Sequence, residues 1–269
     1  MSHSLDIPTL FNVQGKIVLI TGGGSGIGKM IAAGFVRNGA RVYIAARKEA
    51  QLKEAVGDLQ KFQPPPVKGM WGCDALIAEF KRRETRLHVL VNNSGTSWGA
   101  PFDEFPEKGW DNVFNVNVKS VFYLTAGLTE YICKDASALD PGRVINISST
   151  GSVDPHSEGP VSDKGNGVWS YLPSKAAVNH LTSQLAVKLA PRYVTVNAIL
   201  PGSFPSKMTA FGFKNFEDQL VGSQPMGKVG TTADMAGLAL FLAAPASAHI
   251  TGAHIVIDGG ARITKGSRL

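Results

Sequence analysis

The chain has 269 residues, 43% of them hydrophobic, and a formal net charge of +6. This length suits one large α/β domain or two small ones, with enough residues for a buried core. The two cysteines, Cys73 and Cys133, are too few for a disulfide framework, and no group of cysteines and histidines has the spacing of metal ligands, so no metal site is expected.

The distribution of charged and apolar residues argues against nucleic-acid and membrane partners. The basic residues are scattered apart from the run 81–83, which is typical of a solvated helix face rather than of a nucleic-acid-binding stripe. The longest apolar stretch, residues 235–246, is too short to span a bilayer, which takes about 20 apolar residues.

The two ends of the chain bear on where the protein acts. Residues 1–10 include Asp6 and Pro8 and have no apolar signal region, so secretion is not expected. The last three residues, Ser267-Arg268-Leu269, are a close variant of the Ser-Lys-Leu address for peroxisomes. We therefore expect a cytosolic protein or, from a eukaryotic source, a peroxisomal one; a chance match in a frayed tail is the alternative.

Strand and helix patterns alternate after a loose lead-in at residues 1–14. The expected strands are 16–20, 41–45, 67–71, 87–91, 143–147, 193–198 and 253–257. The expected helices are 29–36, 48–62, 75–84, 110–132, 176–190 and 234–243. Regular alternation with apolar strands predicts an α/β fold, a doubly wound (Rossmann-type) seven-stranded parallel sheet with helices on both faces. No linker interrupts the pattern, so we expect a single domain over residues 15–262 and a tail at 263–269.

Two long irregular stretches, residues 150–169 and 202–228, interrupt this alternation. Long loops inside a compact domain are usually functional or disordered. In a doubly wound fold, ligands bind beyond the carboxyl ends of the strands, where both stretches are expected to emerge.

A glycine-rich turn, Thr21 to Gly28, joins the first expected strand to the first expected helix. Its spacing is GxxxGxG, with Gly22, Gly26 and Gly28 at the glycine positions. Strand, glycine turn and helix present free backbone N–H groups to a phosphate, and glycines allow it to approach closely. We expect Thr21, Gly22, Ser25, Gly26, Ile27 and Gly28 to bind a dinucleotide. A tight turn without a ligand is the alternative reading.

The end of the second expected strand indicates which dinucleotide is bound. An acid about 20 residues after the glycines would bind a ribose 2′-hydroxyl, whereas a basic residue accommodates a 2′-phosphate. This chain has Arg47 and Lys48 there, and arginine pairs with phosphate through forked donors. The cofactor is therefore expected to be NADP(H); a surface pair at the start of a helix is the alternative.

The strongest chemical signal is the segment from Tyr171 to Lys175. Residues four apart lie on one face of a helix, and Pro173 is compatible with the first turn. A nearby ammonium and an oxidised nicotinamide both favour the phenolate and are expected to lower the tyrosine pKa. Such a tyrosine can donate a proton to a carbonyl oxygen as hydride reaches the carbon. The YxxxK spacing alone is common by chance, but here it follows Ser149 and the glycine turn.

Together these motifs resemble the short-chain dehydrogenase/reductase family over about residues 14 to 261. The motifs that carry the resemblance are Thr21-Gly22-xxx-Gly26-x-Gly28, Asn92-Asn93-Ser94-Gly95, Asn115-Val116-Asn117-Val118, Ser149 after Asn146-Ile147-Ser148, Tyr171 with Lys175, residues 197–202 and Asp258-Gly259-Gly260. Within the family, residues 204–209 look like those of bacterial 3-ketoacyl reductases of the rhamnolipid-pathway type. Similar fungal chains reduce other ketones in secondary metabolism.

The resemblance implies a role for each of four residues. Tyr171 is the expected proton donor, and Ser149 hydrogen-bonds the substrate carbonyl. Lys175 binds the nicotinamide ribose and lowers the tyrosine pKa, and Asn117 holds a water of a proton relay. Ser148 and Asn115 are the alternatives to Ser149 and Asn117.

The resemblance also extends the set of expected cofactor residues, which is completed by Asp74, Asn93, Tyr171, Lys175, Pro201, Gly202, Phe204 and Ser206. Of these, Asp74 matches an acid that contacts the adenine. Ser206 replaces a threonine bonded to the nicotinamide amide, and the exchange keeps the hydroxyl group.

Two spacings depart from the family. The chain from Asp74 to Asn92 is short, which puts the adenine contact in doubt. The chain from Ser149 to Tyr171 is long, and its extra loop is expected to wall the substrate pocket, with Trp169 as an apolar contact and His156 on the loop surface.

The expected function is NADPH-dependent reduction of a ketone, such as a 3-oxoacyl thioester or a secondary-metabolite ketone, in a homodimer or homotetramer. The alternatives are a reductase of an imine or another acceptor, and a dinucleotide-binding protein impaired in catalysis by the short segment after Asp74.

Overall fold

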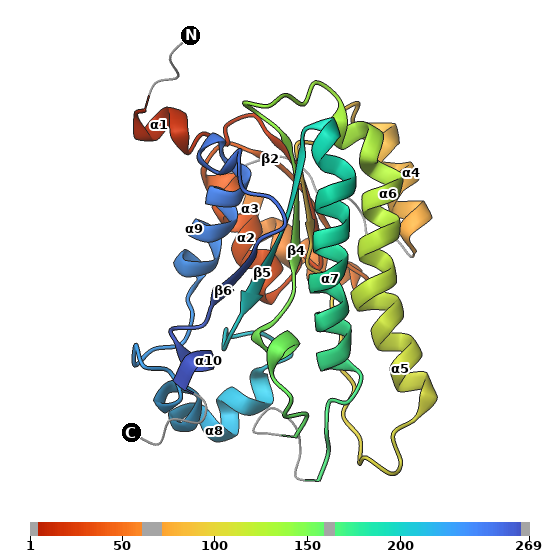
Figure 1. The fold of residues 1–269 in the computed structure, drawn as a ribbon, viewed down its shortest axis with the longest axis vertical. Helices are drawn as coiled ribbons and strands as arrows, with labels where there is room; N and C mark the ends of the chain where they lie inside the picture. Colours follow the sequence, from red (N-terminus) through yellow and green to blue (C-terminus); the bar gives the residue numbers. More distant parts are fainter. Residues whose placement is uncertain (1–4, 61–71, 159–164, 265–269) are drawn as a thin grey trace.

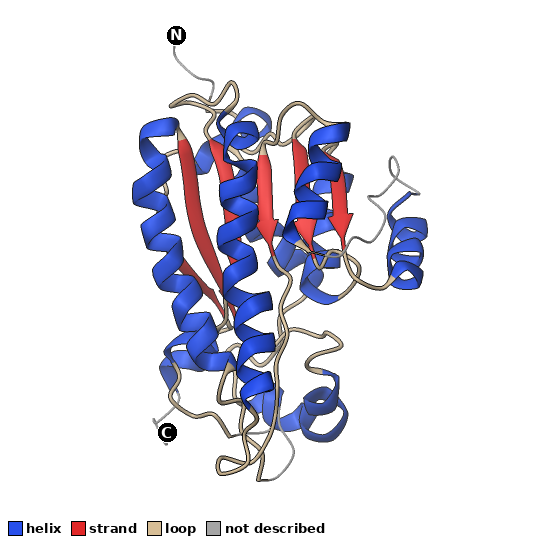
Figure 2. Cartoon of the chain, turned by 90° about the vertical axis from the view of Figure 1, so that its right-hand side faces the viewer, coloured by secondary structure: helices blue, strands red, loops and turns tan. Residues whose placement is uncertain are grey.

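The computed structural model describes residues 5–60, 72–158 and 165–264. Figure 1 shows three layers, with a twisted sheet seen nearly edge-on between two layers of helices. The same sheet faces the viewer in Figure 2, where its strands run in one direction behind the helices of one layer. No helix among the described residues is long and apolar enough to cross a membrane.

The sheet consists of six parallel strands in the described part of the chain. They are β1 (Ile17–Thr21), β2 (Arg41–Ala45), β3 (Val89–Asn92), β4 (Gly142–Ile147), β5 (Val194–Pro201) and β6 (His254–Ile257). Their order across the sheet is β2-β1-β3-β4-β5-β6, and every neighbouring pair is parallel. The doubly wound α/β fold expected from the sequence is confirmed. Seven strands were expected and six are described, because the expected strand 67–71 lies outside the described residues.

The two helical layers explain why the strands are apolar throughout. Alternate residues of β1 point to opposite faces: Val18 and Ile20 join one buried cluster, and Leu19 joins the other. The first cluster packs under α2 (Gly26–Arg37), α3 (Glu49–Gln60) and α9 (Thr232–Ala243). The second packs under α4 (Cys73–Arg83), α6 (Ser120–Cys133) and α7 (Tyr171–Leu189). A strand covered on both sides has no polar face.

Several short elements complete the chain. They are α1 (Ile7–Leu10), α10 (Ala261–Thr264), and the 3-10 turns η2 (Thr150–Val153), η3 (Ala190–Arg192) and η4 (Pro245–Ser247). A longer helix, α8 (Ala210–Gly222), lies inside the stretch 202–228 that was expected to be irregular. Its backbone leaves the helical region at Phe216, which accounts for the weak periodicity of this segment.

The expected helix 110–132 is divided into three parts: α5 (Glu107–Phe114), a π-helical turn η1 (Asn115–Lys119) and α6. The backbone stays in the right-handed helical region across both junctions, so the helix continues with one widened turn. Such π turns are frequent at functional sites. This one contains Asn117.

The order of the strands places the ligand site. The chain leaves β1 toward β2 on one side and returns to β3 on the other, so the crossover direction reverses between β1 and β3. The carboxyl ends of the strands at such a switch point form a crevice in which doubly wound folds bind ligands.

Candidate active site

The glycine turn is tied to the end of β3 by two side chains. Thr21 Oγ1 accepts hydrogen bonds from the backbone N–H groups of Asn93 and Ser94, both at 3.0 Å. Asn93 Nδ2 donates to the carbonyl oxygens of Thr21, at 2.9 Å, and Gly22, at 3.2 Å. In the protein alone, the Asn93 side chain therefore positions the turn.

The glycines of the turn are required by backbone angle and by space. Gly22 and Gly26 have φ values of +67° and +50°, where side chains are strained. A Cβ on Gly28 would lie 2.4 Å from Asn93 Nδ2 and 2.5 Å from the Gly22 carbonyl oxygen. The Gly28 position therefore has no room for a side chain, because the turn packs directly against Asn93 and Gly22.

Replacing Gly28 with alanine is expected to lower the free energy of unfolding by about 2 kcal/mol, because the added methyl group overpacks the turn. Gly237→Ala is the matched control, since its Cβ would meet nothing within 4 Å on the helix α9. That variant should be neutral or slightly stabilised. Urea unfolding of both variants measures the difference, and equal stabilities would contradict the packing explanation.

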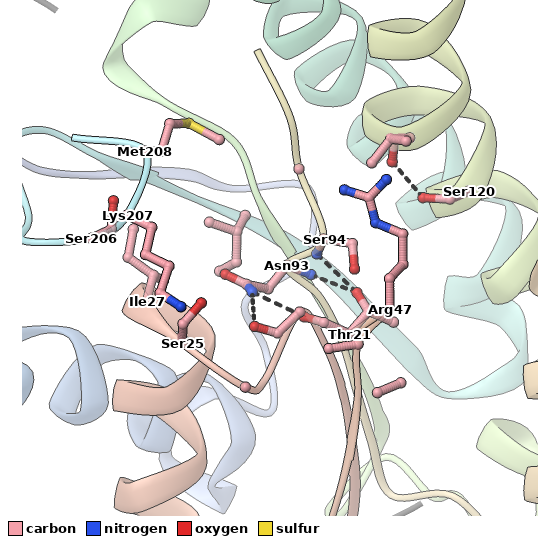
Figure 3. Close-up of a pocket in the computed structure, with 18 of the residues that line it drawn as sticks. Thr21, Ser25, Ile27, Arg47, Asn93, Ser94, Ser120, Ser206, Lys207 and Met208 are labelled. Carbon is pink, nitrogen blue, oxygen red and sulfur yellow. Dashed lines mark hydrogen bonds between the residues drawn. The ribbon is translucent and has the colours of Figure 1, made fainter. Parts of the chain in front are cut away.

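A cavity of about 540 Å³ opens in front of this turn, at the carboxyl ends of the strands (Figure 3). The expected cofactor residues that line it are Thr21, Gly22, Ser25, Gly26, Ile27, Arg47, Lys48, Asn93, Tyr171, Lys175 and Ser206. The expected residues that do not line it are Gly28, Asp74, Pro201, Gly202 and Phe204.

The described lining of this cavity carries only one sign of charge. Its charged residues are Arg47, Lys48, Lys175 and Lys207, and none of its described lining residues is acidic. Such a groove favours a ligand with several negative charges, and a phosphorylated dinucleotide is one.

The two residues expected to bind the 2′-phosphate both line the cavity. Arg47 and Lys48 follow β2 and are exposed. In Figure 3 the Arg47 side chain extends away from the glycine turn, toward Ser120 of α6. Asp74 lies in the first turn of α4 and is exposed, while its neighbours Gly72 and Cys73 line the cavity instead.

The helix α7 begins at Tyr171 and carries the expected catalytic pair. Lys175 is buried, with Nζ 5.6 Å from the centre of the Tyr171 ring and donating to the carbonyl oxygen of Ile147 at 2.8 Å. Tyr171 is half-buried and hydrogen-bonded to Ser149. The neighbouring Ser148 lines the cavity, whereas Ser149 does not, and the Ser148 hydroxyl donates to the backbone oxygen of Lys175 at 3.1 Å. The Ser148 hydroxyl is thus engaged with the backbone of α7, and Ser149 is the serine that interacts with the tyrosine.

The π turn directs Asn117 into the same region. Its side chain is buried, accepts from the N–H of Thr96 at 2.8 Å, and donates to the Thr96 carbonyl oxygen at 3.0 Å and to Ser174 at 2.9 Å. Asn115 is exposed and lines the cavity. A Cβ on Gly95 would lie 3.6 Å from both Asn117 Oδ1 and Lys175 Nζ, so these two polar atoms flank one glycine.

Burial is the main cause of the pKa shifts of Tyr171 and Lys175. Burial raises the pKa of Tyr171 above its ordinary value, and the hydrogen bond from Ser149 only partly opposes this effect. Burial lowers the pKa of Lys175 to about 8. In the protein alone, desolvation disfavours the phenolate and raises the pKa of Tyr171; the expected lowering, which includes the effect of an oxidised nicotinamide, stays a prediction.

The extra loop before Tyr171 is bound to the segment after β3. Gly167 and Ala100 exchange backbone hydrogen bonds of 2.9 and 3.3 Å. The ring of Trp169 packs edge-on against that of Phe102, with centroids 5.0 Å apart. His156 is exposed and pairs with Asp154 at 2.7 Å. The loop therefore presents an aromatic wall beside the start of α7.

Residues after β5 hold a second loop against the glycine turn. Pro201 ends β5, Gly202 packs against Asp258, and Phe204 is buried beneath Gly230. These three residues support the loop, whereas Ser206 reaches the cavity.

Several residues that were not expected to contact the cofactor also line the cavity, among them Gln51, Cys73, Ser94, Gly95, Ser120, Lys207 and Met208. For Lys207 and Met208 a signal was present, since both follow Ser206 directly. Ser120 and Cys73 reach the cavity only through the placement of α6 and α4.

Fold and site together define a dinucleotide-dependent oxidoreductase: a glycine cradle at the switch point, a basic crevice, and a Ser-Tyr-Lys group beside it. A family model described as "Enoyl-(Acyl carrier protein) reductase" matches residues 22–262. The chain belongs to this family of short-chain dehydrogenases/reductases.

Individual relatives cover nearly the whole chain. It is 40% identical to the rhamnolipids biosynthesis 3-oxoacyl-[acyl-carrier-protein] reductase of Pseudomonas aeruginosa, over 93% of this chain and 97% of that protein. It is 34% identical to the 3-oxoacyl-[acyl-carrier-protein] reductase FabG of Thermotoga maritima, over 92% and 98%. The solved Pseudomonas aeruginosa RhlG/NADP active-site complex superimposes with a TM-score of 0.86 at 38% identity, covering 94% of this chain and 98% of that one.

Proposed function

We propose that this protein reduces a ketone to an alcohol with NADPH, and catalyses the reverse oxidation. The observation that carries the proposal is the placement of Tyr171 and Lys175 at the end of a basic crevice that begins at the glycine turn, with Ser149 interacting with the tyrosine. A proton donor and a hydrogen-bonding hydroxyl stand together where a carbonyl oxygen could be held.

Each residue of the site has one task in this reaction. Ser149 orients the carbonyl oxygen by a hydrogen bond, and Tyr171 Oη transfers its proton to that oxygen. A tyrosine whose pKa is raised by burial is protonated at neutral pH, which is the form that reduction needs. Bound NADPH supplies the hydride that reaches the carbonyl carbon. Lys175 would hold the nicotinamide ribose. Asn117 would hold a water molecule through which a proton returns to Tyr171.

The cofactor is NADP(H), in agreement with the relative solved with NADP. The turn from Thr21 to Gly28 would hold its pyrophosphate, and Arg47 with Lys48 would pair with the 2′-phosphate. The remaining expected contacts are Asp74, Asn93, Pro201, Gly202, Phe204 and Ser206. Among them Ser206 has the most direct access, since it lines the cavity opposite Gly26.

The substrate class follows from the relatives and from the aromatic wall. The two relatives named above are 3-oxoacyl-[acyl-carrier-protein] reductases. The Phe102–Trp169 pair offers an apolar surface next to the catalytic group. A 3-oxoacyl thioester is therefore the first candidate, and a ketone of secondary metabolism is the second.

The working form is a homodimer or homotetramer. Exposed aromatic residues lie along the continuous helix of α5, η1 and α6: Trp110 is 39% exposed, Phe122 45% and Tyr123 57%. Burying such a surface against a second copy removes apolar area from water.

NADPH consumption by the purified protein tests the function. The panel contains 3-oxoacyl thioester mimics, cyclic ketones and imines. We expect turnover of at least one ketone and of no imine. Turnover of imines alone would favour the alternative function, a reductase of an imine or another acceptor. NADPH binding without turnover across the panel would favour the impaired dinucleotide-binding alternative.

A further inference from the structure

Lys207 lies on the loop between β5 and α8 and lines the cavity together with Ser25, Gly26 and Ile27 of the glycine turn. In Figure 3 its side chain runs toward Ser25 at the start of α2, while Arg47 stands on the other side of the cavity. The basic groups of the crevice therefore lie at three places: Lys207 is at the glycine turn, Arg47 and Lys48 follow β2, and Lys175 is on α7.

The backbone that carries Lys207 is fixed by its neighbours. Thr209 Oγ1 donates to the Phe204 carbonyl oxygen at 2.7 Å and accepts from the N–H of Ser206 at 2.9 Å. A Cβ on Gly26 would lie 2.9 Å from Ser206 Cβ, so the loop packs directly on the glycine turn. Lys207 is thus held over the start of α2 by a braced loop.

The charge on Lys207 has no carboxylate partner within 4.0 Å among the residues that the structure describes. Its side chain is exposed. The Ser25 side chain makes no capping hydrogen bond to the first turn of α2. An unpaired ammonium and an uncapped helix start face the same space, and both favour an anion there.

We infer that Lys207 binds the pyrophosphate of the dinucleotide from the side opposite the α2 N–H groups. This assignment rests on the proposed function, because it needs the cofactor in this crevice. Under this assignment, two basic residues recognise different parts of the cofactor. Lys207 acts on the pyrophosphate, which NADPH and NADH share, whereas Arg47 acts on the 2′-phosphate, which NADPH alone carries.

The test is direct titration of NADPH and of NADH against Lys207→Met, which keeps the apolar stem and removes the charge. We expect both dissociation constants to rise by the same factor, about fivefold. Lys207→Arg should retain binding within about twofold of the wild type, since it keeps the charge. The slope of log Kd against log salt concentration should also become shallower for Lys207→Met, because one ion pair is lost.

Lys214→Met is the matched control, because Lys214 is exposed on α8 and does not line the cavity. Circular dichroism shows whether each variant folds, and Lys207→Gln is the second neutral variant. Unchanged dissociation constants in folded Lys207→Met, or a loss confined to NADPH, would overturn the assignment. Failure of the wild-type protein to bind either dinucleotide would instead refute the proposed function.

Discussion

Replacing Tyr171 with phenylalanine is expected to lower kcat for ketone reduction by about 10³-fold, within the range that general acid catalysis contributes. The change removes the hydroxyl that donates the proton and keeps the ring in its half-buried position on α7. Because Lys175 Nζ is held by the Ile147 carbonyl oxygen, it keeps its place without the hydroxyl. The dissociation constant of NADPH should therefore stay within about twofold of the wild-type value.

Steady-state kinetics and NADPH titration on the same preparation separate the two effects. Tyr193→Phe provides the control, since Tyr193 is 52% exposed after η3 and loses the same hydroxyl away from the cavity. A Tyr171→Phe variant with full activity would refute the assigned proton donor. A variant that no longer binds NADPH would assign the hydroxyl a binding role instead.

Replacing Arg47 with aspartate is expected to reduce the ratio of kcat/KM for NADPH to that for NADH by about 100-fold. The guanidinium group that pairs with the 2′-phosphate is lost, and a carboxylate that repels it takes its place. The same carboxylate can accept a hydrogen bond from the 2′-hydroxyl of NADH. The NADH rate should therefore hold or rise while the NADPH rate falls.

The ratio is measured with one ketone at saturating concentration and both dinucleotides. Lys134→Asp makes the same change of net charge at an exposed position beyond the end of α6 and should leave the ratio unchanged. If Arg47→Asp also leaves it unchanged, the reading of this position as the 2′-phosphate site is wrong.

Local patterns in the sequence predicted most of the fold. Buried parallel strands need apolar residues on both faces, so runs such as 17–20 and 89–91 stand out even without alternation. The helix α8 was missed because its backbone kinks at Phe216 and breaks the periodic pattern. The π turn was also missed, because a widened turn shifts the register of a helix without changing its composition.

Some features of the site were also predictable from local spacing in the sequence, and others were not. The spacing of Tyr171 and Lys175 predicts their contact, because residues four apart on a helix are always neighbours. The directions of their pKa shifts were not predictable from this spacing, since burial by other segments is the largest cause of both. Asp74 was expected at the cavity from its position in a family motif, but it does not line the cavity.

The sequence by itself therefore determined the fold class, the glycine cradle, the Tyr171–Lys175 pair and the basic residues after β2. All of these depend on residues close together along the chain. Only the tertiary structure decided that Lys207 stands over the glycine turn and that Asn117 and Lys175 flank Gly95. The physical reason is the order of the strands, which brings the ends of β1, β3 and β5 to one edge of the sheet from distant parts of the chain.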